Sequence, residues 1–157
     1  KVSGTLKLEL AQYRSLEAFA LFASDLDSAS RQQLARGARL MELLKQPQYS
    51  PYPVEDQTVS IWAGTTGKLD EVPVEDVLRF ESEFLDYLRR NSGALTTIRE
   101  TNNLDDDTIA ELDSAILKFK KSFQTGQGVP LASVGNETVS ALDEEEVDQE
   151  QIVRQKR

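Results

Sequence analysis

The chain has 157 residues, 39% of them apolar, so it is long enough to form one domain with a hydrophobic core. Its net charge of −9 argues against a general nucleic-acid surface and an anionic membrane surface, because both attract clustered lysine and arginine. The absence of cysteine and histidine excludes thiol catalysis, disulfides, thiolate zinc sites and imidazole acid–base chemistry.

Two further features concern the whole chain. No apolar run reaches the roughly 20 residues that a membrane-spanning helix needs, so we expect no direct membrane insertion. The chain begins at Lys1 without a methionine and enters a periodic pattern at once. We therefore expect it to be a piece cut from a larger protein.

The first predicted helix covers residues 6–24, where apolar side chains recur at helical spacing. The short piece "TLKLEL" also alternates like a strand, but the longer window favours a helix. A second helix follows a group of N-cap residue types: Ser24, Asp25, Asp27 and Ser28. Gly37 inside this helix costs about 1 kcal/mol relative to alanine, which close packing against another helix would explain.

Three prolines, Pro47, Pro51 and Pro53, end the second helix and predict a loop. A short third helix over residues 54–64 leads into a turn region with two glycines. The clearest helix is the fourth, which starts at Pro73, carries acids in its first turn and ends near Gly93. Its predicted apolar face consists of Val74, Val77, Leu78, Phe84, Leu85 and Leu88.

Two more helices are predicted, a short one after residue 94 and a long one over residues 104–128. The long helix places apolar residues on one face: Ile109, Leu112, Ile116, Phe119 and Phe123. The fold class is therefore all-α, a bundle of about six helices over residues 1–128. Residues 129–157 hold seven acidic and three basic residues and few large apolar ones, which predicts a flexible, disordered C-terminal extension.

Two motifs suggest ligand sites but fit simpler roles better. "GTTGK" at residues 64–68 is too short for a phosphate-binding loop and carries leucine where a hydroxyl should bind Mg²⁺, so we expect a turn between helices. The acids in "SDLD" and Asp105–Asp107 lack the glycine and terminal glutamate of a calcium loop, and capping of helices explains most of them. No metal site is predicted.

The amides Gln46 and Gln48 flank Pro47 at the end of the second helix. Polar residues are ordinary in a loop, and this is the simplest explanation. However, a carboxamide offers donors and an acceptor together, which matches the edge of an adenine base. A proline between two such amides would hold them at fixed directions.

The segment "VSGTLKLELAQYRSLEAFALFASDLDSASRQQLARGARLMELLKQPQYSP" closely resembles the start of the C-terminal helical domain of F-type ATP synthase alpha subunits. The similarity continues more loosely to about Gln127, and departures such as Ala23, where glycine is usual, are small. The resemblance implies part of a proton-translocating enzyme that makes ATP from ADP and phosphate. Three alpha and three beta subunits of that enzyme alternate around a gamma rotor, at the cytoplasmic face of the bacterial plasma membrane.

The resemblance also implies roles for individual residues. Gln46 and Gln48 match glutamines that lie against the adenine of a non-catalytic nucleotide. Residues Ala23, Ser24, Asp25, Leu26 and Asp27 match a loop that faces the gamma rotor, where the carboxylates would meet basic groups. The full subunit would bind ATP or ADP with Mg²⁺. Its phosphate loop and its catalytic arginine lie upstream of Lys1, so we expect no catalytic residue and no tightly bound nucleotide here.

The extension resembles those of actinobacterial, mycobacteria-like alpha subunits, in which it is associated with restraint of ATP hydrolysis. The charged residues that would reach the gamma subunit are Asp143, Glu144, Glu145, Glu146, Arg154, Lys156 and Arg157. The alternative to this assignment is a free-standing helical protein-interaction module. Assignment as a di-iron carboxylate bundle is excluded, because its Glu-x-x-His motifs need histidine.

Overall fold

The computed structural model describes residues 2–20, 26–46 and 50–134, and side-chain burial up to residue 132. The described residues form an all-α bundle without a named strand, which confirms the predicted fold class. The helices of eight residues or more are α1 (Ser3–Ala20), α2 (Ser28–Leu43), α3 (Val54–Thr65), α4 (Val77–Asn91), α5 (Ala94–Thr101) and α6 (Asp106–Ser122). A 3-10 turn, η1 (Val74–Asp76), precedes α4, and a single turn, α7 (Leu131–Val134), follows α6.

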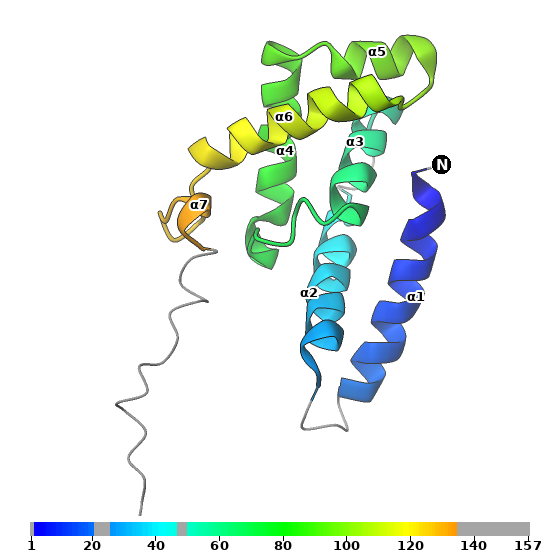
Figure 1. Cartoon of the computed structure of the whole chain (residues 1–157), viewed down its shortest axis with the longest axis vertical. Coiled ribbons are helices and arrows are strands. Elements are labelled where there is room, and N and C mark those ends of the chain that lie inside the picture. The colour runs from blue at the N-terminus through cyan, green and yellow to red at the C-terminus, as the bar shows by residue number, and fades with distance from the viewer. Residues whose placement is uncertain (1, 21–25, 47–49, 135–157) are drawn as a thin grey trace, which may run out of the picture.

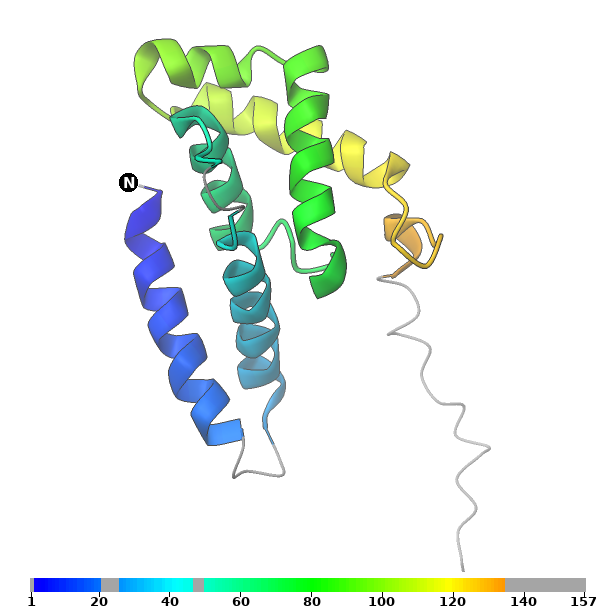
Figure 2. The same cartoon turned by 180° about the vertical axis from the view of Figure 1, so that it is seen from behind.

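Helices α1 and α2 form an antiparallel hairpin, and α3 lies beyond the end of α2 (Figure 1). Helix α3 runs back toward α2, because Gly64 near its end lies against Leu40 and Leu43 in the last turn of α2. Helix α6 crosses α4, and α5 joins the two at the end of the molecule far from the α1–α2 corner (Figures 1 and 2). The two helices of the hairpin approach each other closely at Gly37, where a Cβ atom would lie 2.3 Å from Cδ2 of Tyr13. The predicted close helix packing at Gly37 is therefore confirmed.

The core lies between α3, α4 and α6 and is rich in aromatic side chains. Phe80 is fully buried, and its ring centroid lies 5.1 Å from that of Phe119 and 5.0 Å from that of Phe123, both edge-on. Such arrangements suit the quadrupoles of aromatic rings. By contrast, no residue of α1 is buried, and Leu8 and Phe19 are each 59% exposed.

Helix boundaries differ from the predictions at three places. Helix α1 begins three residues earlier than expected and is described only to Ala20. The first residues of the predicted fourth helix form η1, and the Asp76 side chain accepts a hydrogen bond from the Gly126 backbone amide instead of capping α4. Helix α6 ends at Ser122 instead of 128, since Phe123 is extended and directs its ring into the core.

The segment after α6 folds back on the body. Gln124 and Pro130 form an isolated antiparallel bridge around a turn in which Gly128 has a φ of +76°. The Leu131 amide donates to the Phe123 carbonyl over 3.0 Å, and Leu131 is 1% exposed. Packing on the body thus continues to Leu131, past the boundary predicted at residue 128. The sequence predicted disorder over residues 129–157. The structure instead shows residues 129–134 in the turn and in α7, and residues 135–157 lie outside the described residues.

Candidate functional site

The candidate amide Gln46 lies just after the end of α2 and is exposed. Leu40 and Leu43 in the last turn of α2 are buried, and the Leu44 amide donates to the Leu40 carbonyl over 3.1 Å. The end of the helix is therefore anchored while the Gln46 carboxamide remains available to a ligand. Gln48 lies outside the described residues, so only one member of the amide pair has a described position.

The described end of the proline-rich segment is tied to the start of α3. The Gln57 side-chain amide donates to the Tyr52 carbonyl over 2.7 Å, and the Gln57 backbone amide donates to the Pro53 carbonyl over 3.0 Å. Tyr52 itself is half-buried. These contacts fix the direction in which the backbone enters α3.

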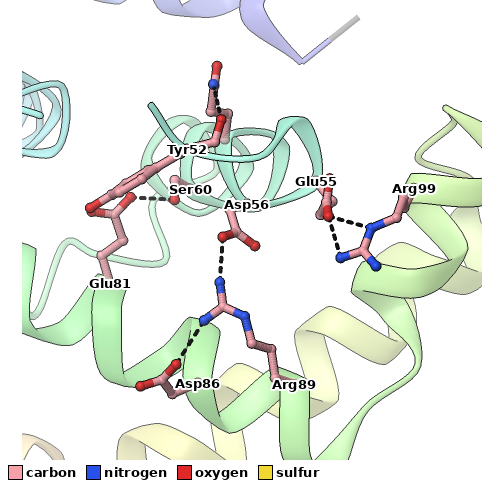
Figure 3. A network of polar contacts seen from close by, with 9 residues as sticks. Tyr52, Glu55, Asp56, Ser60, Glu81, Asp86, Arg89 and Arg99 are labelled. Atoms are coloured by element: carbon pink, nitrogen blue, oxygen red, sulfur yellow. Dashed lines mark hydrogen bonds and ion pairs between the residues drawn. The ribbon is translucent and has the colours of Figure 1, made fainter. Parts of the chain in front are cut away.

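Next to the start of α3 lies a network of carboxylates and guanidinium groups (Figure 3). Asp56 in the first turn of α3 accepts from Arg89 of α4 over 2.5 Å, and Glu55 accepts from Arg99 of α5 over 2.5 Å. Acidic groups at a helix N-terminus also interact favourably with the helix dipole. The network therefore joins three helices beneath the proline-rich segment.

The two neighbouring carboxylates differ in their electrostatics. Hydrogen bonding by its own backbone N–H, followed by the Arg99 contact, lowers the pKa of Glu55. Burial raises the pKa of Asp56, although the charge of Arg89 opposes this shift. Both side chains are buried, Glu55 at 6% and Asp56 at 3% exposed, so the difference lies in their hydrogen bonds: these outweigh desolvation of the charged form at Glu55 but not at Asp56.

Glu81 of α4 is a further buried carboxylate, 5% exposed. One oxygen, Oε1, accepts from the Ser60 hydroxyl of α3 over 2.5 Å, whereas Oε2 is buried and has no hydrogen-bond partner among the described residues. Burial raises the pKa of Glu81, the Ser60 hydrogen bond lowers it, and the charge of Asp56 raises it further.

The segment predicted to face the gamma rotor, residues 23–27, is described only at its end. Leu26 is half-buried and Asp27 is exposed, whereas Ala23, Ser24 and Asp25 lie outside the described residues. Asp27 is the N-cap of α2, with Oδ1 accepting from the Ser30 amide over 2.9 Å. The residues of the candidate regulatory tail, numbered 143–146, 154, 156 and 157, also lie outside the described part.

The two weaker motifs have the structural roles that the sequence favoured. "GTTGK" is a turn with Gly67 at a φ of +75°, and the Lys68 ammonium pairs with Asp113 over 2.6 Å. Asp105 is the N-cap of α6 and accepts from the Thr108 amide over 2.8 Å. Among the described residues no acidic cluster could hold a metal ion, and no helix is long and apolar enough to span a membrane.

The buried network was not predicted from the sequence, in which Arg89 reads as a helix-end charge and Glu55, Asp56 and Glu81 do not stand out. A charged residue on the apolar face of a predicted helix is the signal that could have identified these carboxylates. Glu81, which follows Phe80 on the buried face of α4, is an example. The network pairs most of its carboxylates with arginines, an arrangement suited to holding helices and not to acid–base catalysis.

Comparison with known proteins identifies the relationship. The family described as "ATP synthase alpha/beta chain, C terminal domain" matches residues 1–119. The protein is 74% identical to the ATP synthase subunit alpha of Leifsonia xyli over 157 residues and 69% identical to that of Clavibacter sepedonicus. The corresponding Nocardioides protein is 62% identical over 158 residues. The alignments cover 99–100% of this chain but only 29% of each relative.

Proposed function

Because the protein belongs to the family of C-terminal domains of ATP synthase alpha and beta subunits, we propose that it is the C-terminal part of an alpha subunit of the proton-translocating F-type ATP synthase. The observation that carries this proposal is similarity over all 157 residues to actinobacterial proteins named ATP synthase subunit alpha. The chain spans 29% of the length of these relatives, so the activity belongs to the larger protein. The complete enzyme would make ATP from ADP and phosphate at the cytoplasmic face of the plasma membrane.

We propose that the domain packs against beta subunits in an alternating ring around the gamma subunit. Support comes from α1, none of whose residues is buried and which exposes the large side chains Leu8 and Phe19. Exposed apolar side chains on one helix suit burial against another protein. At the corner between α1 and α2, Asp25 and Asp27 would face basic groups of gamma.

A second part of the proposal concerns a nucleotide that is bound but not turned over. Gln46 and Gln48 would contact the adenine, with ATP or ADP and Mg²⁺ held mainly by upstream parts of the subunit. The exposed carboxamide of Gln46, on an anchored helix end, fits the donor and acceptor pattern of an adenine edge. The fragment alone would then be non-catalytic and bind nucleotide weakly.

The test uses the intact alpha subunit assembled with beta and gamma. Replacing both amides, Gln46→Ala with Gln48→Ala, is expected to raise the dissociation constant of the non-catalytic nucleotide about tenfold or more, as for two lost hydrogen bonds. Gln32→Ala, which removes an exposed glutamine from α2, is the matched control. Unchanged affinity in the double variant would show that Gln46 and Gln48 do not contribute to adenine binding.

We further propose that residues 135–157 restrain ATP hydrolysis by pairing with charges on gamma. The acidic block Asp143–Glu146 and the basic end with Arg154, Lys156 and Arg157 supply both signs of charge. Truncation after Val134 keeps the packed Leu131 and is expected to raise hydrolysis while synthesis persists. Equal hydrolysis rates in the truncated and complete enzymes would reject this role.

The alternative function is a free-standing helical interaction module, which the exposed face of α1 would also suit. The two proposals differ in their need for a beta subunit. Solution mass measured with and without beta separates them: a defined complex with beta supports the alpha-subunit proposal, and a stable assembly formed without beta favours the module.

A further inference from the structure

The buried oxygen Oε2 of Glu81 has no partner among the described residues, and its surroundings do not supply one. The adjoining cavity is about 10 Å³ and is lined mainly by apolar side chains of α2, α3 and α4. A water molecule needs roughly 10–15 Å³ and two to four polar partners, so this cavity is a poor place for one. A buried acceptor without a partner is unusual in a folded protein.

Tyr52 is a polar side chain directed toward the Glu81 carboxylate. Its ring extends from the proline-rich segment toward Glu81, on the side where Ser60 donates to Oε1 (Figure 3). Burial raises the pKa of the Tyr52 hydroxyl, and the nearby charge of Glu81 raises it further. The hydroxyl therefore lies close enough to Glu81 to sense its charge.

We propose that Tyr52 and Glu81 are a pair of positioning residues for the adenine contact of Gln46: in the nucleotide-bound subunit the Tyr52 hydroxyl donates to Glu81 Oε2. This inference rests on the proposed nucleotide site. The hydrogen bond would attach the segment between α2 and α3 to helix α4. Gln57 holds the Tyr52 carbonyl over 2.7 Å, which fixes the backbone from which the Tyr52 side chain extends.

The pair offers a route by which the body of the domain contributes to nucleotide binding without touching the nucleotide. Tyr52 is six residues after Gln46, and prolines between them restrict the backbone. Fixing Tyr52 on α4 would reduce the number of directions that the Gln46 amide can adopt. Preorganisation of this kind strengthens binding and sharpens the choice between bases.

The experiment uses the assembled enzyme carrying Tyr52→Phe, Glu81→Leu or both. Leucine suits the apolar surroundings of Glu81, and phenylalanine removes only the hydroxyl. Each single variant is expected to raise the dissociation constant for ATP at the non-catalytic site by about threefold to tenfold. The preference for ATP over GTP is expected to fall, a change that general loosening of the fold would not produce.

The double variant is the decisive measurement. If the two side chains act through one hydrogen bond, the double variant binds ATP about as well as the weaker single variant. Tyr87→Phe and Glu83→Gln, on the same helix, are controls that keep wild-type affinity. Tyr52→Phe is the more conservative change and remains informative if Glu81→Leu does not assemble.

Two outcomes overturn the inference in distinguishable ways. If Gln46→Ala weakens ATP binding but Tyr52→Phe leaves affinity and base preference unchanged, the positioning pair is wrong and the nucleotide site stands. Additive losses in the double variant have the same meaning. If Gln46→Ala leaves ATP binding unchanged, the proposed adenine contact fails, and the positioning role fails with it.

Discussion

Asp76 accepts a hydrogen bond from the backbone amide of Gly126, 50 residues later in the sequence, over 2.8 Å. The same carboxylate pairs with Arg79 over 3.0 Å, and Arg79 donates to the Gln124 carbonyl over 2.6 Å. The Arg79 guanidinium also lies 4.4 Å from the ring centroid of Phe123. The start of α4 therefore holds the turn that follows α6 against the body.

Removing this carboxylate should loosen the turn. Asp76→Ala leaves the Gly126 amide without its acceptor and is expected to lower the free energy of unfolding by about 1–2 kcal/mol. Faster amide hydrogen exchange at Gly126 would locate the effect. Glu75→Ala, a neighbour in η1, is the control and should change stability by less than about 0.5 kcal/mol.

The Asp76 contribution should also depend on pH. The Gly126 amide, and then Arg79, lower the pKa of Asp76 in the folded protein. Its stabilising effect is therefore present above the pKa of an unfolded aspartate and is lost as the pH falls through the folded pKa. The difference between wild type and Asp76→Ala, measured by urea unfolding, should shrink on acidification; a constant difference would contradict this assignment.

Leu131 is expected to behave as a core residue although it follows the predicted end of the body. It is 1% exposed, so Leu131→Ala should cost about 2–4 kcal/mol through lost burial and an unfilled cavity. Leu117→Ala makes the same chemical change at a side chain that is 61% exposed and is the matched control. Similar losses in the two variants, measured by urea unfolding, would show that Leu131 does not pack on the body.

The sequence predicted the helices well because their signals are local. Periodic apolar residues, the Asp105 cap and the prolines after α2 all act within a few residues of the structure that they determine. The predicted face of α4 included Phe84 but omitted Phe80, which is fully buried beside Phe119.

The buried polar contacts could not be predicted in the same way. Asp56 and Arg89 are 33 residues apart, and each is explained locally by the dipole of its own helix. The Glu81–Ser60 pair joins α4 to α3, so its burial follows from tertiary packing. The same holds for Asp76, which the sequence assigned to a first turn and the structure assigns to a contact with Gly126. The role of Gln46 was inferred from a family resemblance, because an exposed amide has no distinctive local pattern.

Gly37 should resist substitution despite its position within a helix. Alanine favours a helix by about 1 kcal/mol over glycine, but its Cβ would lie 2.5 Å from the Cβ of Tyr13, so α1 must move away from α2. Gly37→Ala is therefore expected to speed amide hydrogen exchange throughout α1. Gly4→Ala, at a position in α1 with nothing within 4 Å, is the control and should slow it or leave it unchanged. Equal protection of α1 in wild type and Gly37→Ala would contradict the close contact.

Glu81 should make the wild-type protein less stable as the pH rises. Burial raises the pKa of Glu81 in the folded state, so the folded protein holds this proton more tightly than the unfolded protein does. Stability is therefore lost as the pH rises from the ordinary glutamate pKa through the raised one. Glu81→Gln keeps an acceptor for Ser60 but cannot ionise, so its stability relative to wild type should increase over the pH range that begins at the ordinary glutamate pKa and extends upward. Urea unfolding of both proteins measures this difference, with the exposed Glu83→Gln on the same helix as control. A difference that stays constant over this range would mean that Glu81 ionises in the folded protein as readily as in the unfolded one.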